Sequence, residues 1–392
     1  MSRSERVRLS AVVLAVVFTQ LLVYRGVDRL VESLGGAPTI DAGTAFLAAQ
    51  LLAFVLFAAV WGAISDRVGR RMPLVVLGAL GGAVAYLGLA AVVLSGVGGF
   101  RAAIALRFVE GAFTVGAFSL SVTMLMDLGG EHGRNMGAAG IAIGGGAALG
   151  APIGGQLYAF GPLAPILASA ALLVVVAVVA STIPDRAPGQ GRHLGAAAGV
   201  IRDRPTLFVP FAFGFADRFT AGFFGLVGTF YFRDSFGVSP AGVGLLLACF
   251  FVPFALLQYP FGMLSDRVGR AVPIAAGSAG FGLATVGVGM APTVSLAAAG
   301  MVLVGVLGAL VAPATMALVT DIVEGSERGA AMGVFNVFGS LGFLGGIVGG
   351  GGLVARYDYV TAFAVAGGLE IAVAIVTLPV LFAVFHRSET EG

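Results

Sequence analysis

Twelve long apolar stretches follow one another along this chain of 392 residues, and they limit what it can fold into. A helix that crosses a bilayer needs about 20 consecutive apolar residues. Hydrophobic residues make up 58% of the chain and charged residues only 11%, too few to cover the surface of a soluble protein of this size. The sequence therefore predicts an all-α polytopic membrane protein. It excludes an ordinary soluble enzyme, a disordered chain and a nucleic-acid-binding protein.

The expected spans form two sets of six. They lie near residues 9–33, 43–64, 73–96, 101–125, 135–159, 163–184, 206–232, 240–264, 272–291, 294–319, 330–353 and 360–385. The longest polar interruption falls between the sixth and seventh spans. We therefore expect an N-terminal six-helix bundle over 1–185, a cytoplasmic linker over 186–205 and a C-terminal six-helix bundle over 206–392.

All 22 basic residues are arginines, and their distribution predicts the orientation of the chain. An even number of spans places both termini on one side of the membrane. Fifteen arginines fall on that side and three on the opposite side. Because basic loops stay in the cytoplasm, we expect cytoplasmic termini and a location in the inner or plasma membrane. The remaining arginines fall within spans: Arg25, Arg29, Arg107 and Arg218.

A nine-residue segment repeats with an offset of 200 residues: GAISDRVGR at 62–70 and GMLSDRVGR at 262–270. Each copy follows the second span of its half. Its glycines permit a tight turn, and its aspartates can face a helix N-terminus or a nearby arginine. The residues concerned are Gly62, Asp66, Arg67, Gly69 and Arg70 in the first copy, and Asp266, Arg267, Gly269 and Arg270 in the second.

These two copies resemble the loop signature of the major facilitator superfamily, G-x-x-x-D-R-x-G-R-[R/K], and the resemblance extends over essentially the whole chain. It implies two pseudo-symmetric six-helix bundles that move by alternating access. It also implies that the loops act as a conformational latch between the halves on the cytoplasmic side. The alternative is a plain positively charged loop that only sets topology.

The fourth span contains Arg107, Glu110, Gly111 and Thr114, which share one helix face. This segment is similar to the family's R-x-x-[Q/E]-G motif, and the resemblance implies a role in proton coupling for Arg107 and Glu110. Because an arginine facing lipid is costly, that face must look into the protein or a wet cavity, with Thr114 as a candidate lining residue. Alternatively, Arg107 and Glu110 only brace the helix.

The fifth span resembles the family's antiporter motif, G-x-x-x-G-P-x-x-G-G, with Ala151 inserted before the proline. The matching residues are Gly146, Gly150, Pro152, Gly154 and Gly155. The resemblance implies exchange of substrate for protons. The alternative is a glycine-rich face that packs closely on a neighbouring helix. A second glycine-rich face in the eleventh span is its expected pseudo-symmetric partner.

Charged and polar residues at the end of the first span form another candidate site. Gln20, Tyr24 and Asp28 step by four residues and would line one face, with Arg25 beside Asp28. A carboxylate whose pKa responds to exposure and to arginine pairing suits a proton carrier. Asp28 is therefore a proton-carrier candidate, or else part of a wetted cluster at the outer rim, as we expect for Glu32.

The seventh span places Asp217, Arg218 and Phe219 near the membrane midplane. Asp217 is a proton-coupling candidate, and Arg218 and Phe219 are substrate-cavity candidates. Adjacent side chains point about 100° apart on a helix, so we expect different partners for Asp217 and Arg218. Glu370, at mid-depth in the twelfth span, is expected to face lipid or to support the core.

These features favour a proton-coupled antiporter that exports small lipophilic or amphipathic compounds, because the spans are rich in phenylalanine and poor in amides. One alternative is a symporter or uniporter of a small organic anion held by the buried arginines. Another is a non-transporting receptor or scaffold. Na⁺ could replace H⁺ as the coupling ion.

Catalytic, metal and cofactor sites are not expected. The single cysteine, Cys249, lies in an apolar run, the three histidines are far apart, and no nucleotide-binding motif appears. A monomer in the bilayer is what the family resemblance implies.

Overall fold

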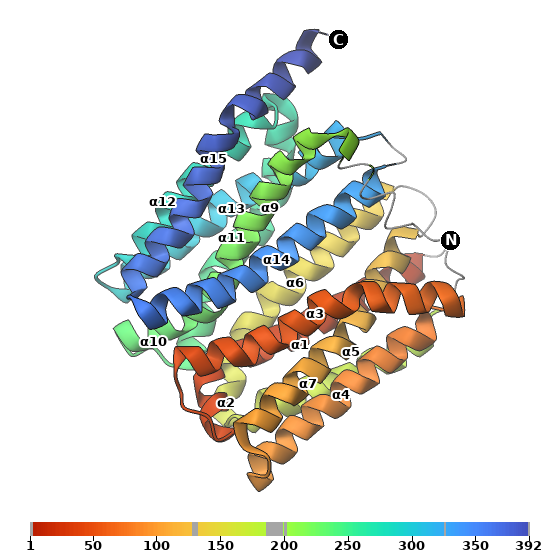
Figure 1. The fold of residues 1–392 in the computed structure, drawn as a ribbon, viewed down its shortest axis with the longest axis vertical. Helices are drawn as coiled ribbons and strands as arrows, with labels where there is room; N and C mark the ends of the chain where they lie inside the picture. Colours follow the sequence, from red (N-terminus) through yellow and green to blue (C-terminus); the bar gives the residue numbers. More distant parts are fainter. Residues whose placement is uncertain (1–2, 128–131, 186–198, 200–201, 325–326, 391–392) are drawn as a thin grey trace. The chain divides into compact units, whose positions relative to one another are not determined.

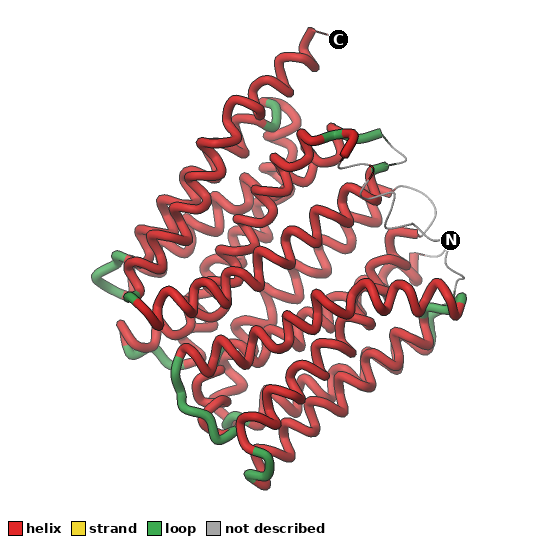
Figure 2. The backbone as a smooth tube through the Cα atoms, in the orientation of Figure 1, coloured by secondary structure: helices red, strands yellow, loops and turns green. Residues whose placement is uncertain are grey.

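The computed structural model describes residues 3–127, 132–185, 199, 202–324 and 327–390, and within these ranges the chain forms helices and no strands (Figures 1 and 2). The helices are α1 (Arg3–Tyr24), α2 (Val27–Ser33), α3 (Ile40–Val68), α4 (Met72–Ser95), α5 (Gly99–Asp127), α6 (His132–Leu157), η1 (Tyr158–Phe160), α7 (Leu163–Ser181), η2 (Pro205–Leu207), α9 (Phe208–Phe223), η3 (Phe224–Gly228), α10 (Thr229–Phe236), α11 (Pro240–Val268), α12 (Ala271–Gly289), α13 (Val294–Ile322), α14 (Arg328–Arg356) and α15 (Tyr359–Thr390).

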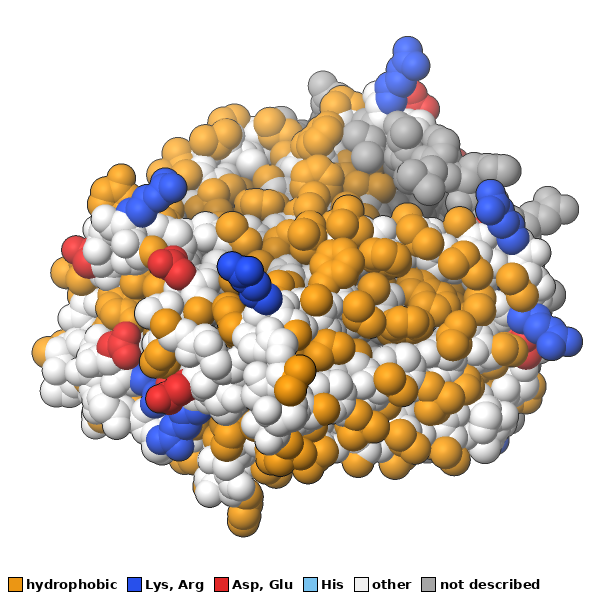
Figure 3. All heavy atoms as spheres, turned by 60° about the horizontal axis from the view of Figure 1, so that its bottom comes forward, with side chains coloured by type: hydrophobic (Ala, Val, Ile, Leu, Met, Phe, Trp, Pro, Cys, Tyr) orange, Lys and Arg blue, Asp and Glu red, His pale blue; other side chains and the backbone are white. Residues whose placement is uncertain are grey.

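Twelve helical stretches in the described residues are long and apolar enough to cross a membrane, from Ser4–Tyr24 to Tyr359–Leu381. This count confirms the predicted fold class. Hydrophobic side chains cover much of the face in Figure 3, where charged side chains are few and scattered. Such a surface is stable against lipid and unstable against water.

The chain divides into two compact units. Unit 1 contains Met1–Gly191 and Phe232–Ala248, and unit 2 contains Arg192–Tyr231 and Cys249–Gly392. In unit 1, α1 packs on α6, and α4 lies beside α5 and α7 (Figure 1). In unit 2, α9 packs on α14, and α12 lies beside α13 and α15. The same pairing of helices therefore recurs in both units. Most of the predicted linker, 186–198 and 200–201, lies outside the described residues.

Glycine rows bring one helix pair together in each unit. A Cβ atom on Gly146 or Gly154 of α6 would lie 2.6 Å from the carbonyl oxygen of Leu14 or Leu22 on α1. A Cβ atom on Gly342 or Gly346 of α14 would lie 2.1 or 2.0 Å from the carbonyl oxygens of α9. Only glycine permits such close backbone approach, so these rows fix both helix pairs.

The sequence predicted one continuous helix over 9–33 for the first span, and the structure shows that this is wrong. Helix α1 ends at Tyr24 and α2 begins at Val27, with a turn at Arg25 and Gly26. The ring of Tyr158 lies 2.6 Å from where a Cβ atom of Gly26 would stand, and its hydroxyl donates to the carbonyl oxygen of Val23 over 2.6 Å. Tyr158 thus supplies a donor to a carbonyl at the helix end.

The seventh span is irregular at the corresponding depth. Between α9 and α10, residues Phe224–Gly228 form the π-helical segment η3. Insertions of this kind are rare inside α-helices and often occur at functional positions. Spans one and seven, which occupy equivalent places in the two repeats, therefore both depart from regular helix.

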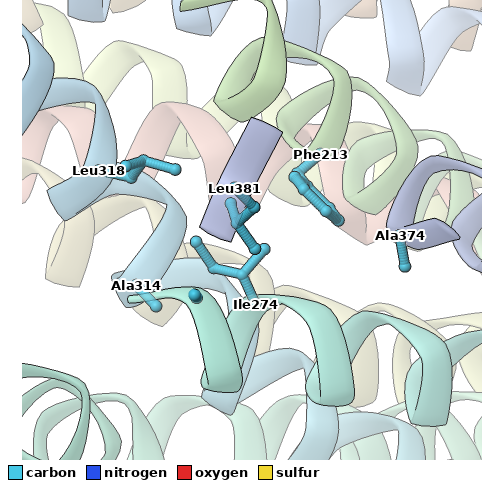
Figure 4. Close-up of a cluster of buried hydrophobic side chains, with 7 residues drawn as sticks. Phe213, Ile274, Ala314, Leu318, Ala374 and Leu381 are labelled. Carbon is cyan, nitrogen blue, oxygen red and sulfur yellow. The ribbon is translucent and has the colours of Figure 1, made fainter. Parts of the chain in front are cut away.

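A cluster of apolar side chains holds four helices of unit 2 together (Figure 4). Phe213 of α9 is fully buried, as are Ile274 of α12 and Ala314 of α13, and Leu381 of α15 is 1% exposed. In lipid, such packing contacts stabilise helix association more than the hydrophobic effect does. The cluster anchors α9, which carries the candidate site residues of the seventh span.

Candidate functional site

Arg107 is the centre of a buried polar network in unit 1. Its guanidinium donates through Nη1 to the hydroxyl of Tyr86 at 3.0 Å and to Oε2 of Glu110 at 2.9 Å. Its Nη2 donates to Oε1 of Gln50 at 2.6 Å. The side chains of Arg107, Glu110, Gln50 and Tyr86 are each 0% exposed. The network therefore joins α3, α4 and α5 through one buried cation.

Aromatic residues complete the surroundings of this arginine. The rings of Phe46 and Tyr86 lie 5.2 and 5.6 Å from its Cζ atom, within the range of cation–π attraction. The hydroxyl of Tyr24 donates to Oε1 of Gln50 at 3.4 Å, which connects α1 to the network. Four helices of unit 1 thus meet around Arg107.

The network leaves some polar atoms without a partner. Oε1 of Glu110, Nε of Arg107 and Nε2 of Gln50 are buried and make no hydrogen bond. A buried carboxylate oxygen without a donor is costly while the group is ionised. Protonation of Glu110 would remove the charge and weaken its bond to Arg107, while the bonds from Arg107 to Gln50 and Tyr86 could remain. The geometry thus allows two arrangements that differ by one proton.

The other two residues of the fourth-span motif serve helix packing. A Cβ atom on Gly111 would lie 2.3 Å from the carbonyl oxygen of Gln50, so this glycine brings α5 against α3. Thr114 is fully buried, and its hydroxyl donates to the backbone oxygen of Glu110 at 2.9 Å. Its methyl group faces Gly82 of α4, which places Thr114 at the interface of α4 and α5.

Asp28 lies in α2, outside the candidate spans, where its Oδ2 pairs with Nη1 of Arg233. The depth predicted for Asp28 assumed an unbroken helix, so the turn at Gly26 changes it. Burial raises the pKa of Asp28 above its ordinary value, although Arg233 acts in the opposite direction. The sequence placed Arg25 beside Asp28 but did not single out Arg233 as its partner.

The remaining candidates of the first span are buried in unit 1. Gln20 is 9% exposed and its Nε2 makes no hydrogen bond. Arg25 is 1% exposed at the turn between α1 and α2. The structure brings Tyr24 to the Arg107 network, and Asp28 forms a separate ion pair with Arg233.

In unit 2, the neighbours Asp217 and Arg218 have different surroundings. Asp217 is partly buried, and its Oδ1 makes no hydrogen bond. Arg218 is exposed, and Gly339 of α14 leaves room for its stem. Phe219 packs over Gly345 and Gly349 of α14. An exposed guanidinium in mid-span would be costly against lipid, so Arg218 requires water or a polar partner at this depth.

The two copies of the repeated loop make different contacts. Gly69 and Gly269 adopt φ values of +66° and +84°, the left-handed conformation expected for tight turns. In the second copy, Arg270 bonds to Asp266 and, through Nε, to Oδ2 of Asp321 at 3.1 Å, all within unit 2. Burial acts to lower the pKa of Arg270, but these two carboxylates outweigh it and raise the pKa.

In the first copy, Asp66, Arg67 and Arg70 are exposed, and Gly62 is partly buried. The carboxylate at the N-terminus of α4 comes instead from Asp185, whose Oδ1 accepts from the backbone N–H groups of Arg71 and Met72 at 2.9 and 3.0 Å. Arg267, the remaining residue predicted for the latch, is exposed in the second copy. A latch between the halves stays a prediction.

The antiporter-type segment of α6 faces two directions. Gly146, Gly150 and Gly154 face α1, whereas a Cβ atom on Gly155 would lie 2.4 Å from the carbonyl oxygen of Pro240 at the start of α11. Pro152, inside α6, approaches Gly244 of α11 within unit 1. Each glycine of the motif therefore lies where a larger side chain would collide with a neighbouring helix. A role of the motif in exchange stays a prediction.

Sequence reasoning missed Gln50 and Tyr86 as partners of Arg107. Both are isolated polar residues within apolar spans, which is the signal that could have found them. It also missed that Glu370 is fully buried and accepts hydrogen bonds from two helices. Among the described residues, no three His, Cys, Asp or Glu side chains gather in a group able to hold a metal ion.

The fold and the buried charges define an integral membrane protein of twelve helical spans, built from two repeated halves. The family model described as "Major Facilitator Superfamily" matches residues 9–232 and 211–391. The chain belongs to the major facilitator superfamily.

Curated relatives are similar over part of their length. An uncharacterised MFS-type transporter of Methanocaldococcus jannaschii is 28% identical over 171 residues, 44% of each chain. The puromycin resistance protein of Streptomyces alboniger is 32% identical over 31% of this chain and 25% of its own. The multidrug efflux pump LfrA of Mycolicibacterium smegmatis is 33% identical over 29% of this chain and 22% of its own. The matches thus span less than half of each relative.

Solved structures share the fold across nearly the whole chain. The nucleoside transporter NupG superposes with a TM-score of 0.72 at 16% identity, over 96% of this chain and 99% of that one. The human organic anion transporter MFSD10 superposes with a TM-score of 0.67 at 20% identity, over 95% and 99%. At these identities the likeness establishes the fold only.

Proposed function

We propose that the protein is a secondary transporter, and that it is a proton-coupled antiporter that exports small lipophilic or amphipathic compounds. The observation that carries this proposal is the buried pair of Arg107 and Glu110. An ion pair of this kind is an expensive way to hold three helices together, because desolvation offsets much of the attraction. A proton site in the membrane accounts for that cost.

In this proposal Glu110 carries the exchanged proton. While ionised, it shares Nη1 of Arg107 with Tyr86. Once protonated, it no longer holds the guanidinium by charge, and Arg107 keeps its bond to Gln50 on α3. Each proton therefore changes how α5 is held against α3 and α4. A substrate that binds better to one of these arrangements would be coupled to the proton by population shift.

The substrate class follows from the residues around the candidate positions and from the relatives. Phe215 and Phe219 lie on α9 with ring centroids 6.3 Å apart, and both are only partly buried. Such rings suit an apolar or aromatic solute. Two curated relatives are a puromycin resistance protein and a multidrug efflux pump. Export from the cytoplasm, with both termini on the cytoplasmic side, completes the proposal.

One observation favours a second candidate. Arg218 is exposed within a span and carries a guanidinium able to bind a carboxylate or phosphate with two hydrogen bonds. A symporter or uniporter of a small organic anion would use this residue directly. The charge of the transported compound distinguishes the two candidates.

The test uses proteoliposomes loaded with a pH-sensitive dye under an imposed proton gradient. Five compounds are added in turn: puromycin, then a lipophilic cation, then a neutral drug, then an organic acid and finally a sugar. Antiport predicts proton release with a lipophilic compound, lost in Glu110→Gln and retained in Glu32→Gln, which changes an exposed glutamate of α2. Protein-free vesicles correct for weak bases that cross lipid unaided. Proton movement only with the organic acid would favour symport, and none with any compound would contradict proton coupling.

A further inference from the structure

Unit 2 contains a fully buried carboxyl group that the proposed mechanism does not use. Glu370 of α15 is 0% exposed. It lies 11 residues after Tyr359, where the span starts, and is therefore about 17 Å along the helix at 1.5 Å per residue. From its place in the twelfth span we expected Glu370 to face lipid or to support the core. The structure places it among α9, α12 and α15, so it does not face lipid.

Two hydroxyl groups hold this carboxyl. Ser278 of α12 donates to its Oε2 at 2.8 Å, and Thr220 of α9 donates to its Oε1 at 3.3 Å. Both hydroxyl residues are 0% exposed. Among the described residues, Glu370 forms no ion pair with an arginine, which distinguishes it from Glu110. A buried carboxylate with no cation beside it is strongly unfavourable.

The charges near Glu370 increase that cost. Asp217, three residues before Thr220 on α9, repels an ionised Glu370, and its own Oδ1 is buried without a hydrogen-bond partner. Arg218 follows Asp217 but points to the surface of the unit near Gly339. Helix α12 contains no charged residue, and α13 and α14 carry charges only near their ends. Arg218 thus acts on its neighbour Asp217, whereas no arginine in the described part of the chain is paired with Glu370.

The corresponding junction of unit 1 needs no carboxyl. Packing of α6 on α1 and of α14 on α9 aligns Leu14 with Phe215, an offset of 201 residues. The same offset aligns Thr19 of α1 with Thr220 of α9. In unit 1, the hydroxyl of Ser169 simply donates to the backbone oxygen of Thr19 at 3.1 Å. A serine of α7 therefore makes the contact with α1 in unit 1, whereas in unit 2 a glutamate of α15 makes the contact with α9.

We propose that Glu370, fully buried and held by the hydroxyl groups of Ser278 and Thr220, is a second proton-binding site located in unit 2. The proton adds to a carboxylate oxygen of Glu370 and removes its repulsion with Asp217. Asp217 is partly exposed and Glu370 is not. A change of pH in the solvent therefore acts on Glu370 through the charge of Asp217. Only the consequence for transport, a second exchanged proton, rests on the proposed function.

Infrared difference spectroscopy of the full-length protein in lipid vesicles tests this site without any substrate. Spectra recorded across a pH series, in H₂O and D₂O, report the C=O stretch of protonated carboxyl groups. We expect a band that disappears as the pH rises, is lost in Glu370→Gln and is retained in Glu110→Gln and in the exposed control Glu32→Gln. Ser278→Ala, which removes one donor and keeps the carboxyl, is expected to move the same band to higher frequency.

Three results would overturn the proposal. A wild-type spectrum that Glu370→Gln leaves unchanged would mean that Glu370 stays ionised. A Glu370 band that no pH removes would mean a permanently neutral structural acid. A band displaced by NaCl and not by KCl would mean a sodium site. If no compound releases protons from wild-type proteoliposomes, the proposed antiport fails while the band assignment to Glu370 still stands.

Discussion

Nη2 of Arg107 donates to Oε1 of Gln50 across 2.6 Å. This bond connects α5, which carries Arg107, to α3, which carries Gln50. Gly111, four residues after Arg107, permits the approach, because a Cβ atom there would lie 2.3 Å from the Gln50 carbonyl oxygen. The motif in α5 therefore includes both a charge and the glycine that brings its acceptor within reach.

Replacing Gln50 by leucine removes the acceptor of a charged donor in a fully buried site. We expect the free energy of unfolding to fall by about 2 kcal/mol, the usual scale for a lost hydrogen bond to a charged group. Denaturant unfolding in mixed micelles measures it. Gln156→Leu changes an exposed amide on α6 and serves as control. Equal losses in the two variants would contradict the role given to Gln50.

Pattern and composition predicted the class of fold because bilayer-spanning helices depend on length and hydropathy, which are properties of single segments. The partners of the charges were harder to predict, because they depend on which helices pack together. Arg107 and Glu110 could be paired from their spacing in one helix. Gln50 and Tyr86 come from helices 57 and 21 residues away in sequence, and nothing in the local pattern connects them.

The break in the first span illustrates a second limit. Residues 9–33 are apolar enough to suggest one helix, yet the ring of Tyr158, from a distant segment, occupies the space beside Gly26. Tertiary contact therefore decides where α1 ends. For the same reason Asp28 lies in α2, beyond the end of α1, and its partner Arg233 comes from α10.

The contact between α1 and α6 predicts a sharp difference between two glycines of α6. In Gly154→Ala, the new Cβ atom would lie 2.6 Å from the Leu22 carbonyl oxygen, so the helices must separate. We expect a loss of about 1–3 kcal/mol, as for other overpacked sites. Gly144 has no atom within 4 Å of its Cβ position, so Gly144→Ala should be neutral or stabilising. Thermal unfolding of both variants compares them, and a stable Gly154→Ala would refute the packing account.

Asp185 predicts a capping effect at the start of α4. Its Oδ1 accepts from two backbone N–H groups, those of Arg71 and Met72. Asp185→Ala is expected to cost about 1 kcal/mol, the typical value for a lost N-cap. Asp185→Asn keeps an acceptor oxygen and should recover most of that loss. Chemical unfolding of the three proteins provides the measurement, and an alanine variant as stable as the asparagine variant would argue against a cap.

The burial of Asp28 predicts a pH dependence of stability. Burial raises the pKa of Asp28, so the native state binds this proton more tightly than the unfolded state. Its contribution to stability is full below the ordinary carboxyl pKa of about 4 and is lost as the pH rises through the native value. The wild-type unfolding temperature should therefore fall more steeply above about pH 4 than that of Asp28→Asn. The exposed control Asp41→Asn should follow the wild type, and parallel curves for all three would contradict the prediction.

The central claim is that Glu110 carries the exchanged proton, and comparison of two transport modes in one set of vesicles tests it most directly. Glu110→Gln and wild-type proteoliposomes are assayed for proton-driven uptake and for substrate–substrate counterflow, using a radiolabelled compound that releases protons from the wild type. Counterflow needs the moving halves but no proton. The account predicts that Glu110→Gln retains counterflow and loses proton-driven uptake. Proton-driven uptake equal to that of the wild type in Glu110→Gln would contradict it.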